Sequence, residues 1–125
     1  MKRVWIIAFV VLVAVSIGTC GVSMADTAQD RAIRAAREAA QSRGIIVGEA
    51  EIIYDADNKK WEERVAAIEQ LPADPNHGKL PHGMLYNKKY ETVLLDFKED
   101  ATDADVWVFI DKDTGDVLTI YQEER

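Results

Sequence analysis

The chain has 125 residues, of which 48% are hydrophobic, and it carries 15 basic and 22 acidic side chains. That length and composition indicate one domain with enough apolar residues for a core. The acidic balance argues against nucleic acid and anionic lipid as partners, because both are bound by lysine and arginine side chains that neutralise phosphate.

The first 25 residues have the layout of a secretory signal peptide. Lys2 and Arg3 form a basic start, residues 4–18 are a 15-residue apolar run, and Ser23 and Ala25 are small residues at the two positions that a signal peptidase reads. We therefore expect residues 1–25 to be a signal peptide. Residues 26–125 are then one exported domain, periplasmic or extracellular.

Two other fates of the first segment remain open. Residues 4–25 carry no charge, so they could stay in the membrane as an anchor, for which about 20 apolar residues suffice. Cys20 could instead carry a lipid, because Ile17-Gly18-Thr19-Cys20 resembles a bacterial lipobox. In either case we expect membrane contact only through the uncleaved signal or the lipid on Cys20.

Cleavage would leave a domain with a strong negative charge and no disulfide, because Cys20 is the only cysteine. Residues 26–125 hold 13 basic and 22 acidic side chains, a net charge of −9. An apolar core must therefore hold the domain together.

Residues 27–43 are predicted to form a helix. Thr27-Ala28-Gln29-Asp30 has the spacing of a capping box, and an acid suits the first turn of a helix. Gly44 follows as a natural C-cap. One face carries small side chains that let a helix lie close to a sheet: Ala28, Ala32, Ala35, Ala36, Ala39 and Ala40.

After Gly44 the apolar residues recur at every second position, which indicates a half-buried strand over residues 46–54. Residues 55–58 are typical of a turn. Residues 61–71 are ambiguous, because their apolar side chains have helical spacing while the preceding turn suggests a hairpin. We favour a strand there, since a hairpin would give the first strand an immediate partner.

The second half of the chain indicates a loop followed by three strands. Residues 72–83 hold three prolines and two glycines and form the loop. The strands are expected over residues 90–97, 106–110 and 117–121, with the continuous apolar run 106–110 in a central position. Residues 111–116 form a hairpin turn in which Gly115 can take positive φ. The fold class is therefore α+β, with one N-terminal helix, residues 27–43, packed on a four-stranded antiparallel sheet.

Two further features concern aromatic residues. Asn58-Lys59-Lys60-Trp61 and Asn87-Lys88-Lys89-Tyr90 repeat one pattern 29 residues apart, which we interpret as two polar turns that each open into a strand led by an aromatic. Trp61, Trp107 and Tyr90 could line a sugar-binding surface, but we favour a role in covering the sheet.

The inventory of reactive side chains argues against an enzyme. A nucleophile needs a base beside it, but the exported domain has no cysteine and only one serine, Ser42, at the expected end of the helix. We expect no cofactor. Residues 111–116 resemble a calcium loop only superficially, because Gly115 stands at its fifth position and Gln122 at its twelfth.

His77 and His82 are the only histidines, and both lie in the 72–83 loop. Five residues apart among glycines and prolines, they could converge on a transition metal, with Asp74 as a further ligand. A structural zinc site needs four ligands, so solvent-exposed loop histidines are the alternative.

Two segments resemble PepSY domains. Ala32-Ile33-Arg34-Ala35-Ala36 is similar to their opening helix, and residues 108–118 are similar to their closing hairpin, with an acidic turn at Thr114-Gly115 before Val117-Leu118. This ending is also similar to that of cystatin-like and nuclear transport factor-like rolls, in which a curved antiparallel sheet wraps one helix. The resemblance implies a protein-binding domain with an inhibitory or chaperoning role.

We therefore expect a non-catalytic binding or regulatory module of the cell envelope that acts on a protein partner. The residues expected to contact that partner are His77, Lys79, Leu80, His82 and Trp61. The alternative is a metal or small-ligand binding protein that uses the 72–83 loop, with His77 and His82 as metal ligands.

Overall fold

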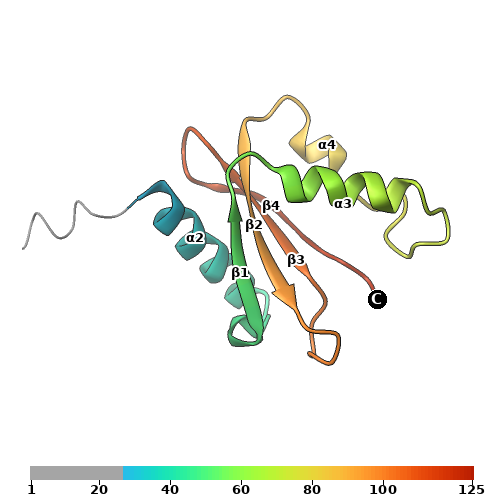
Figure 1. Ribbon diagram of the computed structural model, residues 1–125. Coiled ribbons are helices and arrows are strands. Elements are labelled where there is room, and N and C mark those ends of the chain that lie inside the picture. The colour runs from blue at the N-terminus through green and yellow to red at the C-terminus, as the bar shows by residue number, and fades with distance from the viewer. Residues whose placement is uncertain (1–26) are drawn as a thin grey trace, which may run out of the picture.

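The computed structural model describes residues 27–125, so the expected signal peptide and Cys20 lie outside the described residues. Within the described part, four strands form an antiparallel sheet in the order β1-β2-β3-β4 (Figure 1). The strands are β1 Ala50–Asp55, β2 Tyr90–Phe97, β3 Val106–Asp111 and β4 Val117–Gln122. The α+β class with a four-stranded antiparallel sheet is confirmed. No helix over residues 27–125 combines the length and apolar character needed to cross a membrane.

Helix α2, Ala28–Ser42, covers one face of the sheet (Figure 1). It starts at the expected capping box, where the Thr27 hydroxyl accepts the Asp30 N–H at 3.1 Å and the Asp30 carboxylate accepts the Thr27 N–H at 3.3 Å. Gly44 follows its end with a φ of 80°. The small inner face lets the helix lie close to the strands, and the buried residues on this side are Ala32, Ala36, Ala40, Ile45, Val47, Val93, Leu95, Phe97, Val106, Val108 and Ile110.

Helix α3, Lys59–Glu69, covers the opposite face, so the strand predicted over residues 61–71 is wrong. The helical spacing of its apolar residues was the correct signal, because Trp61 and Ile68 are both buried. Asp55 does not turn the chain into a hairpin. Its carboxylate accepts the Lys60 N–H at 2.7 Å in the first turn of α3, and β1 pairs with β2 instead.

An aromatic cluster fills the space between α3 and the sheet. The Trp61 ring lies 5.2 Å from that of Trp107 and 4.8 Å from that of Phe109, and Tyr90 packs edge-on against Phe109. Such tilted pairs contribute about 0.5–1.5 kcal/mol each beyond their burial. The core interpretation of Trp61 and Trp107 is confirmed, since each is 3% exposed. The sheet is thus the middle of three layers.

The first strand starts later than predicted. Val47–Glu49 form a short 3-10 helix, η1, and β1 begins only at Ala50. This turn breaks the alternation, because Ile46 is exposed while Val47 is buried. From Ala50 onward the alternation holds, with Ile52 on the α2 side of the sheet.

The three later strands agree with the prediction. β2 begins at Tyr90 and ends at Phe97, as expected. β3 is buried on both faces, since Val108 packs on the α2 side and Phe109 on the α3 side. In the turn that follows, Gly115 has a φ of 79°.

Candidate functional site

Exposed apolar side chains gather in the connection between α3 and β2. Of the four large apolar residues exposed in the described part of the chain, three lie there: Leu71, Met84 and Tyr86. A short helix, α4 His82–Leu85, is anchored by Leu85 in the aromatic cluster, which leaves Met84 59% and Tyr86 76% exposed. We use the name α3–α4 surface for Glu62, Val65, Glu69, Leu80, His82, Met84 and Tyr86.

Two hollows open on the α3–α4 surface and meet at Glu69 and His82, which line both. The first, of about 370 Å³, is also lined by His77 and Leu80. The second, of about 260 Å³, has an apolar floor that includes Val65. The Glu69 carboxylate lies 3.1 Å from Nε2 of His82 and joins α3 to α4 between the two hollows.

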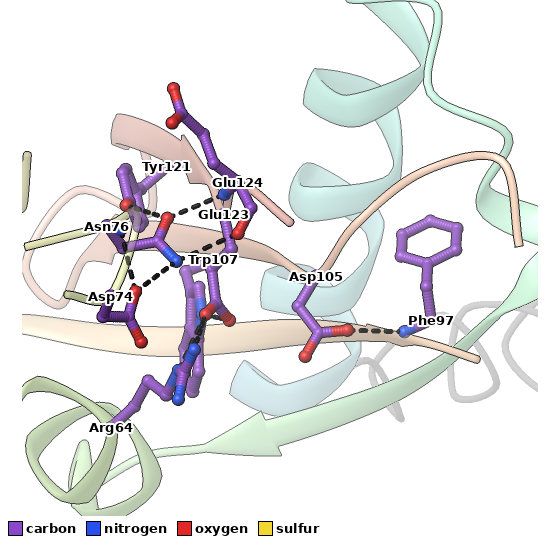
Figure 2. A network of polar contacts seen from close by, with 9 residues as sticks. All are labelled: Arg64, Asp74, Asn76, Phe97, Asp105, Trp107, Tyr121, Glu123 and Glu124. Carbon is purple, nitrogen blue, oxygen red and sulfur yellow. Dashed lines mark hydrogen bonds and ion pairs between the residues drawn. The ribbon is translucent and has the colours of Figure 1, made fainter. Parts of the chain in front are cut away.

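Asn76 fixes the loop that leads to α4, and it is only 1% exposed. Its amide oxygen accepts the Tyr121 hydroxyl at 2.6 Å and the Glu124 N–H at 2.7 Å (Figure 2). Its amide nitrogen donates to the Asp74 carboxylate at 3.0 Å and to the Glu124 carbonyl at 3.1 Å. All four hydrogen-bonding positions of the amide are therefore used, and the loop is held in one arrangement.

The partners of Asn76 have charge states that suit these bonds. The backbone N–H of Asn76, which donates to Asp74, holds the pKa of that carboxyl below its ordinary value. Burial raises the pKa of Tyr121 to about 12, and the charges of Glu123 and Glu124 add to this rise. Asp74 thus remains an acceptor and Tyr121 remains a donor over a wide range of pH.

A second set of bonds joins α3 to the end of β4. The buried Glu123 carboxylate accepts Nε of Arg64 at 2.7 Å and Nε1 of Trp107 at 3.0 Å (Figure 2). Burial opposes the charge on Arg64, but the hydrogen bond and the negative charge of Glu123 outweigh it, so the pKa of Arg64 rises. One oxygen of Glu123 thus binds α3 through Arg64, and the other binds Trp107 of β3.

Asp105 has two features that are typical of a catalytic acid, a raised pKa and a position in a hollow. Burial raises its pKa, although the Phe97 N–H, 2.8 Å from a carboxylate oxygen, opposes this rise. It lines a small hollow of about 170 Å³ together with Glu123. Because the Glu123 oxygens already bind Arg64 and Trp107, we assign this pair to the framework rather than to acid–base chemistry.

The structure separates the residues expected to contact a partner. His77, Leu80 and His82 line the first hollow. Lys79 points elsewhere, and its ammonium group lies 2.6 Å from the Glu124 carboxylate. Trp61 is a core residue, 3% exposed, that also lines the second hollow, so a partner could reach it only there.

The suggested metal ligands, His77 and His82, line one hollow together with Glu69. Over residues 27–125, no group of three histidine, cysteine, aspartate or glutamate side chains is arranged to hold a metal ion. Asp74 instead accepts two hydrogen bonds from Asn76. The metal site at His77 and His82 stays a prediction.

Of the α3–α4 surface, Leu80 and His82 were expected from the sequence, but Met84 and Tyr86 were not. The apolar run Met84-Leu85-Tyr86, directly after a polar loop, was a usable signal for it. No local signal marks Asn76 or Glu123, because their side-chain partners include residues 45 and 59 positions away in sequence.

No protein-family model matches the chain, and no curated protein or solved structure matches it either.

Proposed function

We propose that this protein is an exported, non-catalytic binding module of the cell envelope that regulates a protein partner through its α3–α4 surface. The carrying observation is a pair of exposed apolar residues within this surface, Met84 and Tyr86, which flank the buried Leu85. Apolar side chains that cluster on a surface are typical of protein-binding sites, whereas scattered ones need no explanation.

The anchoring of this connection supports a binding role. Asn76 and Leu85 are both buried, so the connection is fixed at one point before Met84 and at a second point between Met84 and Tyr86 before any partner arrives. A surface that is already ordered loses less conformational entropy on association, and this raises affinity for a given contact area.

The charges around the second hollow indicate the chemistry of the partner. Its rim carries the carboxylates of Glu62 and Glu69, and its floor is apolar. We propose that the partner inserts an apolar side chain flanked by lysine or arginine, because opposite charges at the rim orient the partner and speed association. The net charge of −9 over residues 26–125 would favour the same kind of partner.

Export and regulation are supported by sequence. The signal-like residues 1–25 support a location beyond the membrane, and the resemblance of residues 32–36 and 108–118 to PepSY domains supports an inhibitory or chaperoning role. One helix against an antiparallel sheet, as formed by α2, is compatible with a PepSY-like or cystatin-like roll. Helices α3 and α4, on the other face of the sheet, would be additions to such a roll.

A capture experiment tests the proposal. The tagged full chain is compared with a Met84→Ser/Tyr86→Ser variant and with an Ile46→Ser control, which removes an exposed apolar residue outside the α3–α4 surface. We expect one stoichiometric partner from the native envelope fraction, bound by wild type and control, lost with the double variant, and released as salt is raised. Equal capture by all three proteins would rule out this surface, and no partner above background would count against a binding module.

A second candidate function is supported by the position of the histidines. His77, His82 and Glu69 line one hollow, which favours a metal or small-ligand site over unrelated loop histidines. Calorimetric titration with zinc, copper and calcium tests this candidate. Heat at micromolar metal that is lost in a His77→Ala/His82→Ala variant would establish it, and no heat would remove it.

A further inference from the structure

The guanidinium group of Arg125 is seated among four backbone carbonyls of the loop between β2 and β3. Its Nη1 donates to the carbonyl oxygens of Glu99 at 2.6 Å and Ala101 at 3.2 Å. Its Nη2 donates to those of Lys98 at 2.8 Å and Asp103 at 2.9 Å. We use the name guanidinium cradle for these four carbonyl oxygens.

Bonds that do not involve Arg125 hold this loop in shape. The Ala101 N–H donates to the Lys98 carbonyl at 3.0 Å and closes a turn. The Asp103 carboxylate accepts the Ile46 N–H at 3.2 Å, and it accepts the Gln122 side-chain amide at 3.4 Å. The guanidinium cradle is therefore supported from β4 and from the chain before η1 as well as by its occupant.

The chemistry of the cradle fits a planar cation with several donors. Four carbonyls face two nitrogens that carry two hydrogens each, which is the pattern that the end of an arginine side chain presents. An ammonium group has three hydrogens on one nitrogen and cannot serve all four positions. The carboxylates of Glu99, Asp100 and Asp103 in the same loop add an attractive negative potential.

Exposure makes the resident side chain exchangeable. Arg125 and the loop residues 98–100 are exposed to solvent, so the guanidinium can leave without opening the core. Residues of the loop line two hollows. One of about 390 Å³ is lined by Glu49, Asp100 and Thr102 among others, and one of about 170 Å³ includes Glu99 and Arg125 itself. An incoming side chain thus has space to approach.

We propose that the guanidinium cradle is a binding site for an arginine side chain, which Arg125 of the same chain fills until an arginine of a partner replaces it. The site lies at the β2–β3 loop and is independent of the α3–α4 surface. Its occupant in the free protein acts as a competitor that sets how strongly an external arginine can bind.

Amide chemical shifts of the full chain test the proposal. An Arg125→Ala variant is titrated with N-acetylarginine amide and, as the matched probe, N-acetyllysine amide, which carries the same charge. We expect saturable shifts confined to residues 98–105, with a dissociation constant at least about tenfold lower for the arginine probe. Wild type should bind the arginine probe at least about tenfold more weakly, because Arg125 competes.

Several results would overturn the proposal: shifts that do not saturate, equal binding of the two probes, or equal binding by wild type and variant. Calcium chloride that displaces the arginine probe at constant ionic strength would reassign the carbonyls to a metal ion. If the alanine variant does not fold, Arg125→Lys provides the same test. Lysine keeps the charge, but its ammonium group cannot donate hydrogen bonds to all four carbonyl oxygens of the guanidinium cradle.

Discussion

Arg64 and Glu123 form an ion pair that joins two segments 59 residues apart in sequence, helix α3 and the chain after β4. Glu123 is buried, and its second oxygen accepts Nε1 of Trp107 at 3.0 Å. The pair therefore connects the covering helix to the end of the last strand and to the aromatic cluster between them.

Replacing Glu123 by alanine should lower the free energy of unfolding by about 1–3 kcal/mol, because Arg64 and the indole N–H of Trp107 both lose their acceptor. The expected loss is moderate because the Arg64 side chain is partly exposed. Glu124→Ala is the matched control. Its exposed pair with Lys79 contributes about 0–1 kcal/mol, and its backbone bonds to Asn76 remain. Urea unfolding measures both, and equal losses would contradict this role of Glu123.

The two asparagines of the repeated sequence pattern should respond oppositely to glycine. Asn58 and Asn87 both have left-handed backbones, with φ of 60° and 58°. The Asn58 side chain also donates to the Tyr90 carbonyl at 2.7 Å and accepts the hydroxyl of the buried Thr92. Asn58→Gly should therefore destabilise the protein by about 1–3 kcal/mol.

Asn87→Gly should leave stability within about 0.5 kcal/mol of wild type or raise it, because Asn87 is exposed and glycine relieves the positive φ. Thermal unfolding of both variants checks the pair. A loss at Asn87 as large as that at Asn58 would show that backbone geometry, rather than the side-chain bonds, dominates at these positions.

The Asp105→Asn variant should gain stability relative to wild type as pH rises. Burial raises the pKa of Asp105 on folding, so its stabilising contribution is fully present below the unfolded pKa and is lost as pH rises through the folded pKa. Asparagine keeps an oxygen for the Phe97 N–H and has no charge to bury. Urea unfolding between about pH 3 and pH 7 measures the difference.

Asp111→Asn is the control, because the stability contribution of Asp111 should change with pH in the opposite direction to that of Asp105. The N–H groups of Thr114 and Asp113 hold the pKa of Asp111 below its ordinary value. Its stabilising contribution is therefore present above the unfolded pKa and is lost as pH falls through the folded one. A wild type and an Asp105→Asn variant with parallel pH profiles would contradict the assignment for Asp105.

Tyr121→Phe should loosen the loop around Asn76 and remove one alkaline ionisation. The pKa of Tyr121 is raised to about 12 against an ordinary value of 10.0, so wild type loses stability as pH rises between these values, while the unfolded chain ionises first. Tyr54→Phe is matched, because Tyr54 also has a pKa of about 12 but bonds to Glu91. When the ultraviolet absorbance is followed against pH, each variant should lack one phenol with a pKa of about 12.

Only Tyr121→Phe should speed hydrogen exchange at the N–H groups of Asn76 and His77, since only that hydroxyl binds the Asn76 amide. Faster exchange there in the Tyr54 variant, or no change in the Tyr121 variant, would contradict the anchoring role of Tyr121.

Local patterns were sufficient for most of the sheet and insufficient for α3. The run 106–110 and the turn at Gly115 are set by neighbouring residues, and both were predicted correctly. At residues 61–71 the helical spacing competed with a hairpin argument based on the 55–58 turn. The structure shows that Asp55 serves the start of a helix instead, because a second face of the sheet needed cover.

The α3–α4 surface was predicted only in its location. The predicted 72–83 loop is a loop up to Pro81, where α4 then begins, and the residues that fix it are contributed by β4 and the chain after it. Such contacts depend on where distant strands come to lie, and a single sequence holds no local record of that. The burial of Trp61 was expected, but its ring partners, Trp107 and Phe109, lie 46 and 48 residues later and have no local signal in the sequence.

The strand order has a consequence for how the chain reaches its native state. β2 pairs with β3, and β3 with β4, across short connections, whereas β1 pairs with β2 across residues 56–89, which include α3. Short-range pairings cost less loop-closure entropy than the β1–β2 pairing and form more readily. α2 precedes all four strands and packs against each of them. We expect residues of β2, β3 and β4 to show high φ-values in the folding transition state and the alanine face of α2 to show values near zero.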